Sequence, residues 1–319
     1  MTNLLSVSDL SVRYIVGGRT RHAVDKASLN IPSTGHTIGI VGESGSGKTT
    51  LGLSLMNLIE PPGNIESGQI FFMDKNVLSM NSEELRKFRW HEVAMVYQSA
   101  MNSLNPVKSI TSHIVEVLRE HTDISKGEAR ERAIKLLSDV GIKPERADAY
   151  SHELSGGMRQ RAVIAMALAL SPKLLIADEP TSALDVVVQK QILLLLKKQV
   201  SEARLSLFFI THEIALLGDL VEFVVVMFAG EIVERGALKK VLFEPLHPYT
   251  QMLIGSLLTL DSTREVLGRS AAKDSMVIPE VGCKFAARCK YVFARCRVER
   301  PLLMEVDSGR FVSCHKYST

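Results

Sequence analysis

Hydrophobic positions along this chain follow two distinct patterns. Short apolar runs occupy residues 36–41, 174–177 and 206–210, and they have the composition of strands that a parallel sheet buries on both faces. Residues 186–204 instead place apolar side chains at the period of an amphipathic helix. Because buried strands alternate with helices along the first part of the chain, the pattern predicts an α/β domain.

Three other segments add detail to this prediction. Residues 110–140 have helical periodicity and a charged face, which predicts a helical subdomain. Residues 70–73 are predicted to form a strand that runs into a turn. Residues 223–236 are predicted to form a hairpin whose turn is Ala229-Gly230.

Length and charge limit the choice of protein class. The chain has 319 residues, more than a single core usually reaches, so we expect a large domain over residues 1–258 and an appendage over residues 259–319. Residues 260–281 are mixed and polar, and we interpret them as a linker. A net charge of +3 gives no argument for a nucleic-acid partner.

The sequence predicts no membrane span. A span needs ~20 largely uncharged residues. The most apolar region, residues 205–230, is interrupted by His212, Glu213, Asp219 and Glu222. The first residues also lack the basic and apolar stretches of a signal peptide. We therefore expect a soluble protein that associates with a membrane only through a partner.

The first chemical motif is a complete G-x-x-x-x-G-K-[ST] phosphate loop. Its glycines let backbone N–H groups surround the phosphates, while Lys48 is expected to reach the β- and γ-phosphates and the Thr49 hydroxyl to bind Mg²⁺. A Gly/Ser-rich surface loop is the alternative. The strand before the motif and the helix after it, expected to end before Pro61-Pro62-Gly63, favour a nucleotide site. The predicted ATP-binding residues here are Gly42, Ser44, Gly45, Ser46, Gly47, Lys48, Thr49 and Thr50.

Two acids, Asp178 and Glu179, end the apolar run 174–177. At such a position the first acid can hold Mg²⁺ through water, and the second can orient and deprotonate an attacking water. A pair of solvated acids at a strand end is the alternative. The apolar run before the acids and Pro180 after them favour the catalytic interpretation.

Ser155-Gly156-Gly157 opens an apolar helix predicted over residues 158–170. Ser155 suits an N-cap, the glycines permit close backbone approach, and the helix dipole favours an anion at this end. The phosphate loop already surrounds one side of the chain's own triphosphate. We therefore interpret this second anion site as facing ATP held by another subunit, with a merely capped helix as the alternative.

In this order, the motifs resemble those of an ABC-transporter ATPase over residues 4–258. The resemblance rests on Gly42–Thr49, Gln98, Leu154–Gln160, Asp178-Glu179, residues 182–185 and His212. It implies a P-loop NTPase fold of the ABC type, with a RecA-like core, an antiparallel β subdomain and a helical subdomain.

The same resemblance assigns roles to single residues. Glu179, His212 and Lys48 are the implied catalytic residues, and Thr49, Gln98 and Asp178 are the implied Mg²⁺ residues. His212 would contact the γ-phosphate, Gln98 would also sense the transmembrane partner, and Asp185 would help to align the opposing site. Tyr14 is similar to the adenine-stacking aromatic of the family, with an ordinary strand tyrosine as the alternative.

Further stretches narrow the resemblance to the dipeptide/oligopeptide importer ATPases. These stretches are residues 61–65, 103–106 and 247–250. Met158, where many relatives have Gln, indicates the first of the two paired ATPase subunits. Ser151 departs from the family, which usually has Pro there, and we expect no effect on the chemistry.

All four cysteines, Cys283, Cys289, Cys296 and Cys314, lie in the last part of the chain. For a cytosolic protein this grouping favours metal ligation over disulfides. The region resembles a small cysteine-rich C-terminal extension that carries a [4Fe–4S] cluster in some of these importers. Eight Lys/Arg against three Asp/Glu in residues 282–319 suit an anionic cluster by charge compensation. A Cys₄ zinc site or four unrelated thiols are the alternatives.

The predicted function is therefore an ATP-hydrolysing subunit that powers import of peptides or similar small solutes, at the cytoplasmic face of the membrane. Its expected partners are a homologous ATPase subunit in a heterodimer, two transmembrane permeases gripped near residues 98–106 and, indirectly, an extracellular solute-binding protein, with no nucleic acid. Oligosaccharides and nickel chelates are alternative cargoes. Alternatives of other classes are a non-transport ABC ATPase that acts on ribosomes or DNA, and a metal-sensing redox regulator.

Overall fold

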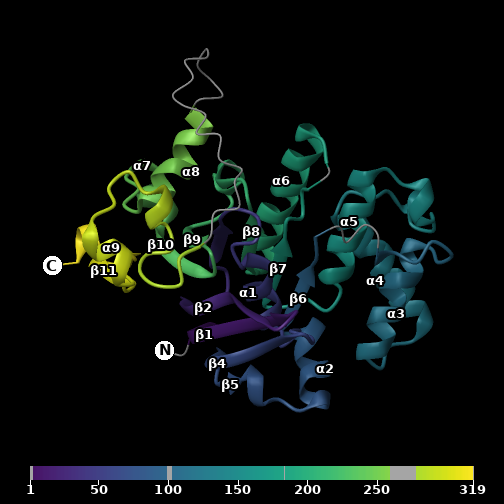
Figure 1. Cartoon of the computed structure of the whole chain (residues 1–319). Helices are drawn as coiled ribbons and strands as arrows, with labels where there is room; N and C mark the ends of the chain where they lie inside the picture. The colour runs from purple at the N-terminus through teal and green to yellow at the C-terminus, as the bar shows by residue number, and fades with distance from the viewer. Residues whose placement is uncertain (1–2, 99–102, 183, 259–277, 319) are drawn as a thin grey trace. The chain divides into compact units, whose positions relative to one another are not determined.

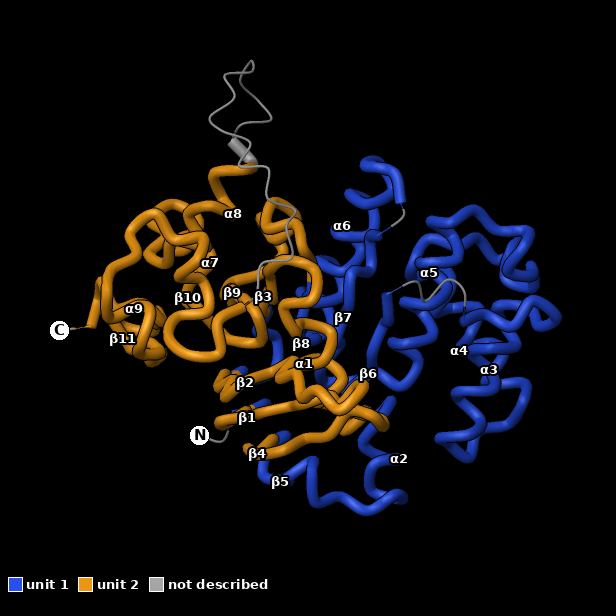
Figure 2. Tube along the Cα trace, viewed as in Figure 1, with its two compact units in different colours: residues 1–5, 31–37, 71–210 blue, residues 6–30, 38–70, 211–319 orange. Residues whose placement is uncertain are grey.

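The computed structural model of the chain describes residues 3–98, 103–182, 184–258 and 278–318 (Figure 1). It contains two compact units, each assembled from separate stretches of sequence (Figure 2). Unit 1 comprises residues 1–5, 31–37 and 71–210, and unit 2 comprises residues 6–30, 38–70 and 211–319. Most of the predicted linker, and part of the segment predicted to grip the permeases, lie outside the described residues.

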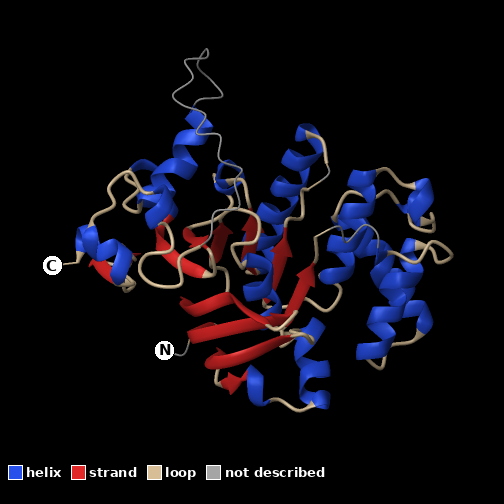
Figure 3. Cartoon of the chain, in the orientation of Figure 1, coloured by secondary structure: helices blue, strands red, loops and turns tan. Residues whose placement is uncertain are grey.

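Strands and helices alternate through much of the chain (Figure 3). The strands are β1 Leu5–Val16, β2 Arg19–Ile31, β3 Thr37–Val41, β4 Gly63–Phe72, β5 Lys75–Asn76, β6 Val93–Val96, β7 Leu174–Asp178, β8 Ser206–Thr211, β9 Phe223–Phe228, β10 Glu231–Ala237, β11 Met304–Asp307 and β12 Arg310–Val312. The helices are α1 Lys48–Ser54, α2 Ser82–His91, α3 Ile110–His121, α4 Lys126–Asp139, α5 Gly156–Ala167, α6 Val186–Ala203, α7 Leu238–Phe243, α8 Pro248–Leu258 and α9 Ala294–Val298.

In unit 1, strands β6, β7 and β8 form a parallel sheet with β7 in the centre. Every residue of β7 is buried, which explains its uniformly apolar sequence before the acid. Ile176 lies opposite Met95 of β6 and Phe208 of β8. Since parallel strands end at the same edge of a sheet, this register places Gln98, which follows β6, near Glu179, which follows β7.

The predicted helical subdomain is confirmed in unit 1, where α3, α4 and α5 pack on one another. Ile110, Ile114 and Leu118 recur every four residues and form the buried face of α3. The helix predicted over residues 158–170 is α5, which begins at Gly156, earlier than predicted, and ends at Ala167. The start differs because both glycines lie inside the first turn, after the Ser155 cap that the sequence predicted.

Unit 2 contributes two sheets. In one sheet β1 lies between β2 and β4. In the other, β3 pairs in parallel with β9, and β9, β10, β12 and β11 follow in antiparallel order. The predicted hairpin is confirmed as β9 and β10, and its turn residues Ala229 and Gly230 both have positive φ, as a two-residue hairpin turn requires.

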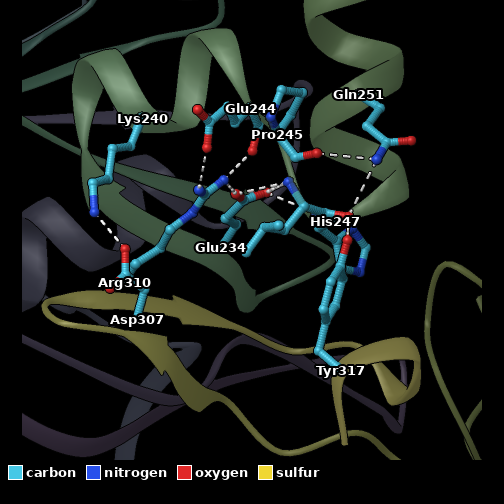
Figure 4. A network of polar contacts seen from close by, with 10 residues as sticks. Glu234, Lys240, Glu244, Pro245, His247, Gln251, Asp307, Arg310 and Tyr317 are labelled. Atoms are coloured by element: carbon cyan, nitrogen blue, oxygen red, sulfur yellow. Dashed lines mark hydrogen bonds and ion pairs between the residues drawn. The ribbon is translucent and has the colours of Figure 1, made fainter.

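A buried ion pair fastens the C-terminal hairpin β11–β12 to β10 (Figure 4). The Glu234 side chain is fully buried and accepts hydrogen bonds from the backbone N–H groups of Leu246 and His247 and from Arg310 Nη2, at 3.2 Å. Lys240 of α7 makes a second, exposed ion pair with Asp307. The last part of the chain is therefore integrated into the sheet of unit 2.

Candidate nucleotide site

The phosphate loop connects β3 to α1 in unit 2, and two of its glycines have no room for a side chain. A Cβ on Gly42 would lie 2.1 Å from the backbone oxygen of Met227. Gly47 has a φ of 100°, and a Cβ there would lie 2.0 Å from the backbone oxygen of Ala23. The loop is therefore packed between β2 and β9, which argues against a loose Gly/Ser-rich surface loop.

Lys48 lies at the centre of this loop and is only 6% exposed. Its ammonium group donates to the backbone oxygens of Gly42, at 2.7 Å, and Glu43, at 2.9 Å. Ser46 is buried, whereas Ser44, Gly45 and Thr49 are exposed and Thr50 is half-buried. A fixed ammonium, the loop amides and an exposed hydroxyl together make a site that suits a phosphate anion and its metal ion.

The acidic strand end in unit 1 has a strained backbone. Asp178 is 1% exposed and ends β7. Glu179 follows with a φ of 45°, a left-handed conformation that costs a non-glycine residue on the order of 1–3 kcal/mol. It is held there because Glu179 N donates to Ile210 O at 2.9 Å and the Ser182 hydroxyl donates to Glu179 O at 2.9 Å.

Gln98 and Glu179, 81 residues apart in sequence, are hydrogen-bonded in unit 1. Gln98 Nε2 donates to Glu179 Oε2 at 3.0 Å. The sequence predicted a role for each residue but no bond between them. The parallel register of β6 and β7, which ends both strands at the same edge, accounts for it. The amide thus fixes the orientation of the carboxylate that is the candidate general base.

The donor groups of the predicted metal residues suit Mg²⁺. Asp178 provides carboxylate oxygens, Thr49 a hydroxyl and Gln98 an amide oxygen, and such oxygen ligands are the ones that this hard cation prefers. Asp178 and Gln98 belong to unit 1 and Thr49 to unit 2.

The Ser155 turn is formed as an N-cap. The Ser155 hydroxyl accepts a hydrogen bond from Met158 N at 3.3 Å and is itself exposed. A Cβ on Gly157 would lie 2.6 Å from a methyl group of Val188, so this glycine lets α5 pack closely on the first turn of α6. Asp185, which is also exposed, caps α6 by accepting from Val188 N at 3.0 Å.

His212 and Tyr14 both belong to unit 2. His212 follows β8, and its side chain is about half exposed, with Nε2 3.5 Å from Glu213 Oε1. Tyr14 is a half-buried residue of β1, and its ring packs on Gly63, where a Cβ would lie 2.7 Å from the ring. The turn at residues 61–63 therefore supports the ring that was predicted to stack on adenine.

Comparison with known proteins decides the family. Residues 24–182 match the model described as "ABC transporter", and residues 233–296 match the oligopeptide/dipeptide transporter C-terminal region. The chain is 41% identical to the oligopeptide transport ATP-binding protein AppD of Bacillus subtilis, over 99% of this chain and 98% of the relative. It is 40% identical to the dipeptide transport ATP-binding protein DppD of Escherichia coli, over 98% and 96% of the two chains. The chain belongs to the oligopeptide/dipeptide ABC transporter family.

Solved structures confirm the predicted fold of this ABC transporter ATPase. A dimeric, post-hydrolysis structure of the ATP-binding cassette MJ0796 bound to ADP and Pi has a TM-score of 0.66 and 28% identity, covering 73% of this chain and 98% of that chain. The structure of cbiO1 from Clostridium perfringens also has a TM-score of 0.66 and 28% identity, and the match covers 76% of this chain and 92% of that chain. Among the described residues, no helix is long and apolar enough to cross a membrane.

The four cysteines of this ABC transporter ATPase line one small cavity of about 20 Å³, together with His247, Phe285 and His315. All four thiols are free. Burial raises the pKa of the Cys283 thiol to about 11 and also raises the pKa of Cys314, while it lowers the pKa of His247 to about 4. Within the described part of the chain, which includes these cysteines, no group of three or more His, Cys, Asp or Glu side chains could hold a metal ion.

The sequence predicted that nearby cations compensate the charge of a cluster. This prediction is wrong for Lys284 and Arg300, because both are paired with carboxylates. Lys284 lies 3.1 Å from Asp25 and 3.2 Å from Glu231, and Arg300 pairs with the same two acids. Composition alone missed this, because Asp25 and Glu231 lie outside the C-terminal region.

Proposed function

We propose that this chain is the ATP-binding and ATP-hydrolysing subunit of an importer for peptides. Its ordered phosphate loop, with Lys48 fixed at the centre, supports nucleotide binding. Peptide cargo is supported by the match to the oligopeptide/dipeptide C-terminal region and by relatives named for oligopeptide and dipeptide transport. Uptake of labelled dipeptides and oligopeptides by cells with and without the gene, compared with uptake of an oligosaccharide and a nickel chelate, tests the cargo.

In the proposed reaction, the chain's own residues position ATP and water. The loop amides and Lys48 bind the phosphates, Tyr14 stacks on adenine, and Thr49, Gln98 and Asp178 are the residues that would hold Mg²⁺, which supplies charge neutralisation when bound. The Glu179 carboxylate, oriented by Gln98, accepts a proton from the water that attacks the γ-phosphorus. The bond from that phosphorus to the β–γ bridging oxygen breaks, and ADP and phosphate leave. His212 stabilises the charge that develops on the γ-phosphate.

The proposed partner across the nucleotide is a second, homologous ATPase subunit. Support comes from the Ser155 turn, an N-cap at a helix end that favours anions, and from the dimeric state of the similar MJ0796 structure. Each composite site would join one phosphate loop to the partner's Ser155–Gly157 turn, with Asp185 aligning the two. Two transmembrane permeases would hold the pair at the cytoplasmic face of the membrane. Co-purification of two membrane subunits is the expected result, and co-purification of ribosomes instead would indicate a non-transport ATPase.

The four cysteines are proposed to hold a [4Fe–4S] cluster. Support comes from four thiols around one cavity, because cluster ligation takes four thiolates. A Cys₄ zinc site is the alternative, and the described residues form no group of three or more metal-binding side chains for either. Iron, acid-labile sulfide and zinc analysis of protein purified without oxygen tests this. About one zinc and no iron per chain would exclude the cluster.

Substitution Glu179→Gln tests the proposed ATPase function. The amide keeps the shape of the side chain but accepts no proton, so hydrolysis is expected to fall ~10²–10⁴-fold while ATP still binds. Steady-state phosphate release and ATP binding are measured in the assembled complex. Glu202→Gln, at an exposed position on α6, is the matched control and should leave both unchanged. Phosphate release within about threefold of the parent would remove Glu179 as the base.

A further inference from the structure

The segment between the first two cysteines contacts the phosphate loop directly, through Glu43. The Arg288 guanidinium donates to both carboxylate oxygens of Glu43, at 2.8 and 2.6 Å. The backbone N–H of Glu43 donates to the Tyr249 hydroxyl at 2.8 Å. Glu43 is an unspecified position of the phosphate-loop motif, so the motif itself gave no reason to expect either contact. The backbone of this loop residue is held from α8, and its side chain is held from the segment between Cys283 and Cys289.

Aromatic side chains connect the cysteine cavity to these contacts. Tyr249 is fully buried, and its ring centroid is 4.7 Å from that of Phe228 and 5.6 Å from that of Phe285. Phe285 also lines the cysteine cavity. The Arg288 guanidinium lies 5.6 Å from the ring centroids of both Phe228 and Phe285. Packing around the four thiols is thus continuous with packing under Glu43.

A second route runs through Lys284, the residue after Cys283. Its ammonium group donates to Ala229 O at 2.9 Å and to Asp25 Oδ2 at 3.1 Å. The next residue of that turn, Gly230, donates its N–H to Ser46 O of the phosphate loop at 3.0 Å. Lys284 and Arg288 therefore fix the loop at two points, Ser46 and Glu43.

We propose that residues 283–289 position the phosphate loop, so that packing around the four cysteines sets the affinity of the loop for nucleotide. Arg288, Lys284 and Tyr249 are positioning residues in this scheme, because they act on the loop backbone through Glu43 and the Ala229-Gly230 turn. The proposal rests on the proposed function only in that nucleotide binds at this loop. Because such coupling is reciprocal, bound nucleotide should also stabilise residues 283–289.

Charge attraction by Arg288 would be a different mechanism, and Glu43 separates the two. If Arg288 acted only as a positive charge near an anionic nucleotide, removal of the Glu43 charge would tighten nucleotide binding. If Arg288 positions the loop through Glu43, removal of either partner weakens binding, because the same bidentate pair is lost.

The experiment measures ADP affinity of the full-length chain by titration calorimetry, well below the melting temperature of each variant. Arg288→Gln, Glu43→Gln and Tyr249→Phe are each expected to raise the Kd ~3- to 10-fold, the range of one hydrogen-bonded contact. Arg288→Lys keeps the charge but not the fork, so its Kd should lie between those of the parent and Arg288→Gln. Arg297→Gln, an exposed cation of the same region, is the matched control and should leave the Kd unchanged.

Specific outcomes would overturn the proposal. These are an unchanged Kd in Arg288→Gln, a lower Kd in Glu43→Gln, or an equal loss in Arg297→Gln. If the parent binds no ADP, or if Lys48→Ala binds it as the parent does, the proposed nucleotide site itself fails. A general loss of stability can be told apart from a misplaced phosphate loop. It lowers the melting temperature without nucleotide but leaves the Kd for ADP at low temperature unchanged.

Cys296→Ala tests the link to the cavity. Cys296 is buried and lines the cavity, and its backbone is bonded to Cys283 and Phe293. Its substitution changes the cavity, including any group that the thiols hold, so a changed ADP affinity would link the cavity to the phosphate loop. We expect its Kd to rise about threefold in the parent background and less in the Arg288→Gln background, since coupled positions are non-additive. An unchanged Kd in Cys296→Ala, or equal increases in the two backgrounds, would refute the coupling.

Discussion

The phosphate loop and the Ser155 turn are both proposed to bind phosphate, yet they are held in different ways. The phosphate loop packs against backbone of β2 and β9 and is bonded by Tyr249 and Arg288, which lie 206 and 245 residues beyond Glu43 along the chain. The Ser155 turn is held by its own cap on Met158 and by packing of Gly157 on Val188.

This difference indicates what each motif needs from the rest of the protein. The phosphate loop depends on the C-terminal region, so changes near the cysteines should alter its nucleotide affinity. The Ser155 turn depends on local contacts within unit 1 and should retain its shape when the C-terminal region is damaged. Three sets of substitutions test this difference between the two motifs.

Loss of the buried ion pair that fastens the C-terminal hairpin β11–β12 should change stability most. Arg310→Met leaves the fully buried Glu234 without its cation, which should lower the free energy of unfolding by ~3–5 kcal/mol. Lys240→Met removes the exposed pair with Asp307 and should cost no more than ~1 kcal/mol. Urea denaturation measures both. Arg310→Met should also weaken ADP binding, but the amide hydrogens of α5 should stay protected from exchange. Equal losses of amide protection in both units would contradict the difference between the two motifs.

The second set compares a glycine-to-alanine substitution in the phosphate loop with one in the Ser155 turn. Gly47→Ala forces a side chain into a left-handed position and against the backbone oxygen of Ala23, so the Kd for ADP should rise at least ~100-fold. Gly157→Ala meets only the side chain of Val188, which can rotate, and should leave ADP binding by the isolated chain unchanged. Titration calorimetry compares the two. Weak ADP binding by the Gly157→Ala chain would mean that the Ser155 turn acts on the chain's own nucleotide.

The smallest effect concerns the helix cap. Ser155→Ala and Ser125→Ala each remove an N-cap hydroxyl, from α5 and α4, and each should cost ~1 kcal/mol of stability. Only Ser155→Ala is expected to slow ATP hydrolysis by the assembled complex, by ~10-fold, because a bond to a charged group is lost as well. Thermal melting and phosphate release measure these two quantities. Equal hydrolysis by the two variants would reduce Ser155 to a structural cap.

Sequence pattern predicted the parts of the site whose chemistry is local. The phosphate loop between a buried strand and a helix, the Ser155 cap and the acids at the end of β7 are all confirmed as local structures. Each depends on neighbours within a few residues, which a motif records. The buried strands and the helical subdomain follow from periodicity for the same reason.

Contacts between distant segments could not be predicted in this way. The bond from Gln98 to Glu179 depends on the register of β6 and β7, and the pair of Arg288 with Glu43 joins residues 245 apart. The basic excess near the cysteines was assigned to an anionic cluster because the acids that pair with Lys284 belong to other segments. Charge composition counts groups, but it does not show which groups meet.

The 245-residue separation of Glu43 from Arg288 has a consequence for biosynthesis. A ribosome that adds ~5–20 residues per second takes about 12–50 s to extend the chain from the first residue to the second. During that interval the nascent phosphate loop lacks a contact that holds it in the finished protein. Before Arg288 is added, the nascent chain should therefore bind nucleotide more weakly than the finished protein does.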